Sequence, residues 1–337
     1  MGLIDVRKLQ NLQALRAVAA TAVVMAHLGA LGARFPAVGT EFGVYGVDIF
    51  FVLSGFIMSY VTRSSWGRPG SFLVHRALRI YPLWWICLII AAPWISRYLF
   101  QAPDMYFGYV ARSWFLWPAI SPRGDLLPLL VPGWTLAYEA AFYLFFAALM
   151  PFDRRGLVVK VLLVFGAAWA CSSLLPSGSA EQRFLANPIY FEFALGALVA
   201  DMHARDFLNA RWISVTCLVA FALVIVAVVS KMNPDGVWRF AICGVPAAAV
   251  LMLALYMESR GRFAPTWLVF LGEASYSLYL THTMTISRLQ AFFSGWFGLL
   301  AIALLCLLVG IIVHLCVERP LLWAARWLRH EAVPARS

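Results

Sequence analysis

The chain alternates between long apolar runs and short polar connections, and the runs have the length that a membrane-crossing helix needs. A helix rises about 1.5 Å per residue, so about 20 apolar residues cross a bilayer. On this basis we predict an all-α, polytopic integral membrane protein with about ten transmembrane helices. The predicted spans lie near residues 12–31, 42–62, 80–98, 134–151, 157–175, 188–203, 212–230, 237–257, 267–288 and 297–317.

Composition agrees with this interpretation and excludes a water-soluble globular domain. Hydrophobic residues make up 63% of the 337 residues, charged residues make up 12%, and the mean hydropathy is +0.81. No internal repeat separates parts of the chain. We therefore predict a single membrane domain over 1–337, with a core at 10–322 and a short basic tail at 323–337.

Basic residues predict how the chain is oriented. If the N-terminus is cytoplasmic, 18 of the 26 Lys and Arg residues lie on the inner side, so both termini are predicted in the cytoplasm. Topology and anionic lipid headgroups then account for the net charge of +10, and no nucleic-acid partner is predicted. The first span resembles a signal peptide, but Ala30-Leu31-Gly32 is a poor cleavage site, and we expect the span to be retained.

Ionisable residues inside the predicted spans indicate chemistry or transport within the membrane, because charge is costly in a bilayer. Arg16 and His27 share the first span and are about 16 Å apart along one helix face. Asp48 lies a few residues into the second span, at the predicted depth of His27. A carboxylate there would orient the imidazole and stabilise its protonated form. The alternative is a purely structural pair between helices.

Two further spans carry polar side chains on apolar helices. In the fourth span Trp134 suits the membrane interface, whereas Glu139 lies too deep for solvation and needs a partner or a proton. In the ninth span Ser275, Tyr279 and His282 form one stripe at spacings of four and three. Hydrogen bonding between helices explains Ser275 and Tyr279 as well as function does.

Arg76 and Arg79 are predicted at the cytoplasmic surface, between the second and third spans. Their spacing of three lets two guanidinium groups converge on one phosphorylated ligand. From spacing alone, ordinary positive-inside charge with anionic lipid is the better explanation.

For several other residues the sequence indicates no functional role. Glu192, Glu273 and His314 are unassigned. Gly46 and Gly55 are expected at close helix contacts. No cysteine has paired metal-ligand spacing, so no metal site is predicted. The sequence does not indicate an oligomeric state.

Taken together, several short motifs resemble acyltransferase family 3, the bacterial membrane enzymes that O-acylate exopolysaccharides, O-antigens and related acceptors. The match runs from about residue 10 to 322 in the expected order. The motifs are Arg16 with His27 eleven residues later, Asp48 to Phe56 (DIFFVLSGF), Arg76 to Pro82 (RALRIYP), Trp134 to Leu136 with Glu139, Ser275 to Leu280 (SYSLYL) with His282, and Glu318 to Pro320 (ERP).

The resemblance implies a cytoplasmic acyl-CoA donor, usually acetyl-CoA, and a saccharide hydroxyl as acceptor. It also implies roles for single residues. At Arg76 and Arg79 it favours binding of a phosphorylated ligand over ordinary positive-inside charge. His27 matches the catalytic histidine, Arg16 the first-span arginine, and Arg76 with Arg79 the donor-associated pair.

We therefore predict a multi-pass O-acyltransferase of the bacterial inner membrane. His27, oriented by Asp48, would act as general base, and Glu139, Tyr279 and His282 would orient the acceptor or stabilise the oxyanion in the same cavity. Trp134 is a further candidate for acceptor binding. The alternative function is a proton-coupled transporter or flippase of a glycan precursor, which would also place ionisable groups within a ten-span bundle.

Overall fold

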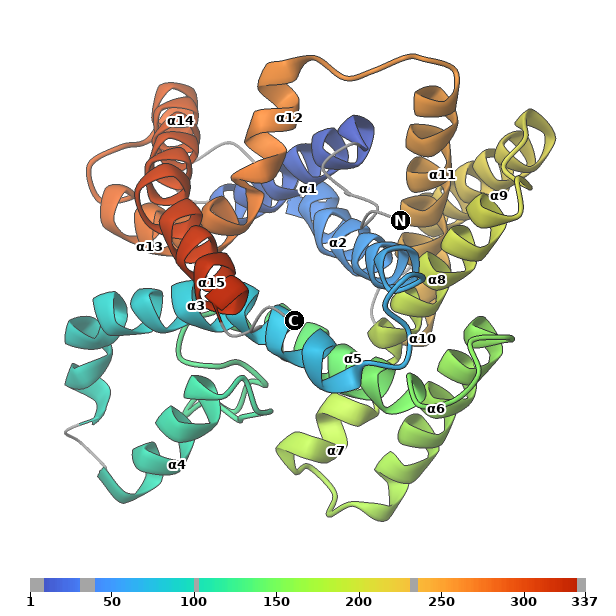
Figure 1. Ribbon diagram of the computed structural model, residues 1–337. Coiled ribbons are helices and arrows are strands. Elements are labelled where there is room, and N and C mark those ends of the chain that lie inside the picture. Colours follow the sequence, from blue (N-terminus) through green and yellow to red (C-terminus); the bar gives the residue numbers. More distant parts are fainter. Residues whose placement is uncertain (1–8, 31–39, 100–102, 231–235, 332–337) are drawn as a thin grey trace.

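A computed structural model describes residues 9–30, 40–99, 103–230 and 236–331, and every long regular element in these ranges is a helix (Figure 1). The all-α prediction is therefore confirmed for the described residues. The first eight helices are α1 (Gln10–Gly29), α2 (Thr40–Val61), α3 (Pro69–Leu99), α4 (Pro103–Trp114), α5 (Gly133–Leu149), α6 (Leu157–Cys171), α7 (Ala180–Leu185) and α8 (Phe191–Ala204). The others are α9 (Ala210–Val229), α10 (Val237–Arg239), α11 (Val245–Ser259), α12 (Thr266–Glu273), α13 (Ser275–Leu289), α14 (Gly295–Val313) and α15 (Arg319–Glu331).

Six helices in the described residues are long and apolar enough to cross a membrane, as expected of a polytopic membrane protein. Shorter apolar helices lie at Tyr45–Val61 and Gly133–Leu149. The predicted total of ten spans and the cytoplasmic termini stay predictions. The first outer connection and the possible cleavage position fall largely on 31–39, outside the described residues.

Close packing around α1 and α2 forms the centre of the bundle. In Figure 1 these two blue helices lie in the middle of the view, and α1 also contacts α12 and α13. Gly46 faces α1, where an added Cβ would lie 2.5 Å from the Ala19 carbonyl oxygen. Gly55 faces α8, where a Cβ would lie 2.0 Å from the Phe193 carbonyl oxygen. The prediction that both glycines serve helix contacts is confirmed.

Two predicted span boundaries are wrong. The third span is predicted at 80–98, but α3 begins at Pro69, so Arg76 and Arg79 lie inside a helix and Pro82 is internal to it. The apolar run at 267–288 forms two helices, α12 and α13, separated at Ala274. The predicted basic tail at 323–337 stays a prediction; its described part, as far as Glu331, belongs to α15.

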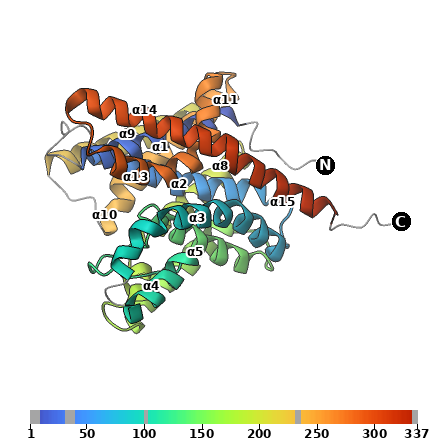
Figure 2. The same ribbon diagram turned by 90° about the vertical axis from the view of Figure 1, so that its left-hand side faces the viewer.

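Two π-helical segments, in which the helix is locally widened, lie beside buried charges. Phe240–Gly244 leads into α11, and His314–Glu318 joins α14 to α15. Such segments occur frequently at functional sites. Figure 2 shows α14 and α15 following one another towards the C-terminal end, and α15 also contacts α3.

Candidate functional site

A cavity of about 1180 Å³ lies between α1, α2, α3, α5, α13 and α15. Its volume is slightly above the roughly 300–1,000 Å³ of typical small-molecule sites, so it has room for a large organic ligand. Tyr276, Tyr279 and Ser275 line its buried end, with at most 9% of each residue exposed. Arg319 and Arg326 line it and are exposed, so the cavity opens to the surface along α15.

Glu139 of α5 lines this cavity, and one of its carboxyl oxygens accepts two hydrogen bonds. Its Oε1 accepts a hydrogen bond from the Ser54 hydroxyl of α2 at 2.7 Å and another from the Tyr143 hydroxyl one turn along α5. The predicted partner for a deep carboxyl is therefore a pair of hydroxyl groups. Both donors also line the cavity, so a ligand there would meet a fixed carboxyl.

Arg76 of α3 reaches the same region across two aromatic rings. Its guanidinium carbon lies 5.7 Å from the centre of the Phe72 ring and 5.8 Å from that of Tyr143, which is cation–π geometry. Its Nε is buried and has no hydrogen-bond partner. Because a buried donor is normally satisfied, Arg76 has spare capacity for a ligand in the cavity.

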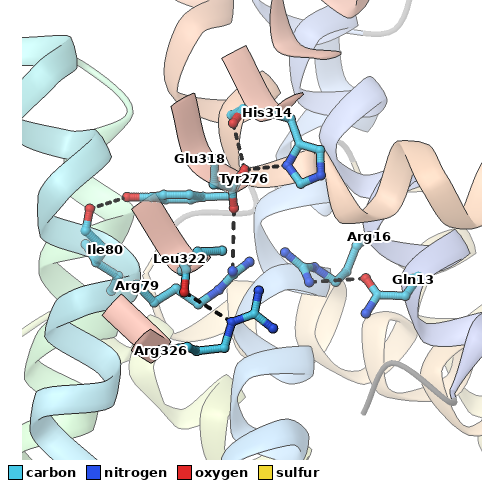
Figure 3. A network of polar contacts seen from close by, with 10 residues as sticks. Gln13, Arg16, Arg79, Ile80, Tyr276, His314, Glu318, Leu322 and Arg326 are labelled. Carbon is cyan, nitrogen blue, oxygen red and sulfur yellow. Dashed lines mark hydrogen bonds and ion pairs between the residues drawn. The ribbon is translucent and has the colours of Figure 1, made fainter. Parts of the chain in front are cut away.

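Arg79 lies one turn further along α3 and belongs to a polar network (Figure 3). Its guanidinium is 3.5 Å from Oε1 of Glu318, and the other Glu318 oxygen accepts hydrogen bonds from Ser277 at 2.7 Å and His314 at 2.8 Å. Arg79 also lies 5.8 Å from the Tyr276 ring centre. The network fixes Arg79 against the π-helical segment between α14 and α15.

Arg16 of α1 approaches the cavity from the side opposite Arg79. Its guanidinium donates to the Gln13 side chain at 3.2 Å. Figure 3 shows Arg16, Arg79 and Arg326 pointing into one space from three different helices. Three guanidinium groups around one opening create a local excess of positive charge that favours an anionic ligand.

His27 and His282 lie together beyond the buried end of the cavity. Their rings meet edge to face with centres 4.8 Å apart, and the His282 ring lies 5.6 Å from that of Tyr279. His282 is fully buried, and its Nε2 has no hydrogen-bond partner. Neither histidine lines the cavity, so Tyr279 is the side chain that connects them to it.

Backbone carbonyls fix the tautomers of both histidines. His27 Nδ1 is 2.9 Å from the Val23 carbonyl oxygen, and His282 Nδ1 is 2.6 Å from that of Tyr279. A carbonyl oxygen can only accept a hydrogen bond, so each Nδ1 carries the proton. In the neutral ring Nε2 is then the basic nitrogen.

The predicted pairing of Asp48 with His27 is wrong. Asp48 is fully buried and accepts two hydrogen bonds from Arg239, at 2.9 Å to Nε and 3.0 Å to a terminal nitrogen. Glu192, also fully buried, interacts electrostatically with both residues and lies within hydrogen-bond reach of the Asp48 carboxyl. Asp48 pairs with Arg239 and not with His27, because a bidentate guanidinium neutralises a buried carboxylate and a neutral imidazole cannot.

Trp134, the further candidate for acceptor binding, lies outside the cavity, and its role stays a prediction. It packs against Phe51 and Tyr138, with ring centres 6.3 and 6.1 Å away, and does not line the cavity. The predicted site residues that do line it are Arg16, Arg76, Arg79, Glu139 and Tyr279. Sequence reasoning missed Ser54, Tyr143 and the Glu318 network, although Ser54 and Glu318 lie in motifs that it quoted. Glu273 and His314, left unassigned, also line the cavity.

The chain is similar to known acyltransferases along most of its length. The acyltransferase domain family matches residues 9–318. The exopolysaccharide production protein ExoZ of Rhizobium meliloti is 30% identical over 84% of this chain and 91% of its own length. The acyltransferase MdmB of Streptomyces mycarofaciens is 26% identical over 83% of this chain and 81% of its own.

A further relative is longer than this chain. The peptidoglycan O-acetyltransferase OatA of Listeria monocytogenes is 27% identical over 81% of this chain, but the match covers only 48% of that protein. No solved structure matches the chain. Because the family match covers nearly all of the described bundle, the chain belongs to acyltransferase family 3.

Proposed function

We propose that the protein transfers an acyl group, acetyl from acetyl-CoA, to a hydroxyl of a saccharide or polysaccharide at the bacterial inner membrane. Membership of an acyltransferase family supports the reaction class. Relatives named for exopolysaccharide production and peptidoglycan O-acetylation support a saccharide acceptor. The observation that carries the proposal is a large, arginine-rich cavity whose buried end adjoins a histidine pair.

The donor enters where the cavity opens, and its phosphates meet Arg76, Arg79 and Arg16. The unpartnered Nε of Arg76 supplies a donor for one of them. Arg16 and His27 are eleven residues apart on one helix, or about 16 Å along its axis. An extended pantetheine arm lying along α1 therefore carries the thioester from the arginines towards the histidines.

The acceptor hydroxyl is deprotonated by Nε2 of His27, which the Val23 carbonyl leaves as the basic nitrogen. The sugar oxygen attacks the thioester carbonyl carbon, a C–O bond forms and the C–S bond breaks. The proton held by His27 then passes to the leaving CoA thiolate. The Tyr279 hydroxyl donates to Thr135, whose own proton goes to the Pro132 carbonyl. In the reaction Tyr279 therefore exchanges this bond for one to the developing oxyanion, and Glu139 orients the acceptor.

The proposal is tested with purified protein, acetyl-CoA and polysaccharide extracted from the host, with O-acetyl groups counted by mass spectrometry. We expect acetylation by the wild type and its loss in His27→Ala. The matched control is His75→Ala, which removes an exposed histidine of α3 that does not line the cavity. Equal acetylation by His27→Ala and wild type would remove His27 from the mechanism. No acetyl-CoA-dependent product from the wild type would reject the proposed donor.

A further inference from the structure

The helix α15 contributes a second, exposed set of side chains to the cavity, beyond the arginines of α3. Arg319, Trp323 and Arg326 line the opening and recur at spacings of four and three. On a helix this spacing makes a single stripe about two turns, or roughly 10 Å, long. The opening of the cavity therefore has a continuous face with an aromatic residue between two cations.

The position of this stripe is fixed by its neighbours. Glu318 directly precedes α15 and is held by His314, Ser277 and Arg79. The start of α15 is therefore joined to the arginine pair of α3, and the two helices are in contact. Figure 3 shows Arg326, the last residue of the stripe, beside Arg79, so a ligand whose phosphates reach Arg79 has its outer end near the stripe.

The side chains of the stripe have capacity for a ligand. Trp323 has 64% of its surface exposed, although it lies beside a cavity that could bury it. Arg326 uses Nε for a hydrogen bond to the Leu322 carbonyl at 3.2 Å, which leaves its terminal nitrogens directed to the opening. An indole face with guanidinium groups on both sides suits an aromatic base that carries phosphate.

We propose that α15 binds the nucleotide end of the acyl-CoA donor, with the adenine stacked on Trp323 and the 3′-phosphate beside Arg326. This inference rests on the proposed function and deepens it by assigning the outer half of the donor site. Charge complementarity supports it, because the described residues lining the cavity include five arginines and three carboxylates. The donor is then held at two points: by α3 at its centre and by α15 at its end.

The test uses calorimetric titration of the full-length protein in detergent with CoA and with adenosine 3′,5′-bisphosphate, the nucleotide end alone. Loss of base stacking should raise the dissociation constant about tenfold. We expect this loss for both ligands in Trp323→Ala, and partial recovery in Trp323→Phe, which restores a ring. Arg326→Ala should lower the affinity for both ligands and reduce the salt dependence of binding.

Trp327→Ala is the matched control, because Trp327 is also exposed on α15 but does not line the cavity. It should bind both ligands like the wild type. Equal losses in Trp323→Ala and Trp327→Ala would indicate a helix that anchors in lipid headgroups, and would overturn the inference. The inference would also be overturned if Trp323→Ala and Arg326→Ala bound both ligands with wild-type affinity. If the wild-type protein bound no CoA, that result would reject the proposed donor itself, and the nucleotide site with it.

Discussion

Replacement of Arg239 should destabilise the protein strongly, because it leaves two buried carboxyl groups without a cation. Asp48 is fully buried, and the Arg239 side chain is 13% exposed. Removing one partner of a buried ion pair costs about 3–5 kcal/mol, since the other charge remains desolvated. We therefore expect Arg239→Met to lower the free energy of unfolding by about this amount.

Glu192 makes the effect asymmetric between the two partners. When Asp48 is changed to Asn, Arg239 keeps a neighbouring carboxyl in Glu192, and a neutral amide replaces one charged acceptor. The loss should then be about 1.5–3 kcal/mol, the range for a hydrogen bond to a charged group. The double variant Asp48→Asn with Arg239→Met should lose less than the sum of the two single variants.

The assay is denaturant unfolding in detergent micelles, followed by tryptophan fluorescence. The control is Arg112→Met, which breaks an ion pair of 2.6 Å to Glu181 with both side chains more than 30% exposed. An exposed pair of this kind contributes less than about 1 kcal/mol. The reasoning is refuted if Arg239→Met is no more destabilising than Asp48→Asn. Lost transfer with an unchanged unfolding free energy in Asp48→Asn would restore the histidine pairing.

Three further predictions concern packing, donor binding and pH. A Cβ at Gly196 would lie 2.0 Å from a carbonyl oxygen of α2, so Gly196→Ala should lower the unfolding free energy by about 1–3 kcal/mol, whereas Gly166→Ala meets open space and should not. Arg76→Lys should weaken CoA binding about tenfold in calorimetry, although the charge is unchanged, because Lys lacks the planar fork. Burial opposes ionisation of Glu181, but hydrogen bonds from a neighbouring indole, its own backbone and Arg112 lower its pKa below 4.5. Stability from this group is complete above about pH 5 and is lost as the pH falls through the lowered pKa, so below pH 5 the wild type should lose slightly more stability than Glu181→Gln.

The helices and much of the cavity could be predicted from the sequence, for a physical reason. Long apolar runs must form helices in a membrane, because unpaired backbone groups are too costly there. Charged residues within such runs avoid lipid and gather inside the bundle, which explains why Arg16 and Glu139 meet in one cavity. Arg76 and Arg79 reach that cavity because their helix begins eleven residues before the apolar run at 80.

Pairing between distant residues could not be predicted in the same way. Arg239 lies 191 residues after Asp48, on a helix of three residues without apolar periodicity. His27 and Asp48 are predicted to pair because they lie at the same membrane depth. Depth does not fix the direction in which a side chain points around its helix axis. The same limitation explains Trp134, whose ring turns towards Phe51 and Tyr138 while Thr135, the next residue, lines the cavity.

Two clusters of charged residues have opposite consequences for a ligand. The cavity cluster has more cations than carboxylates and opens to the surface, so an anionic donor lowers its electrostatic energy. The other cluster, Asp48, Glu192 and Arg239, has one cation for two carboxyl groups, and both carboxyl groups are fully buried. It is neutral only when one carboxyl holds a proton, and it attracts no anion. Changes in the first cluster should therefore alter donor affinity, whereas changes in the second should alter the unfolding free energy.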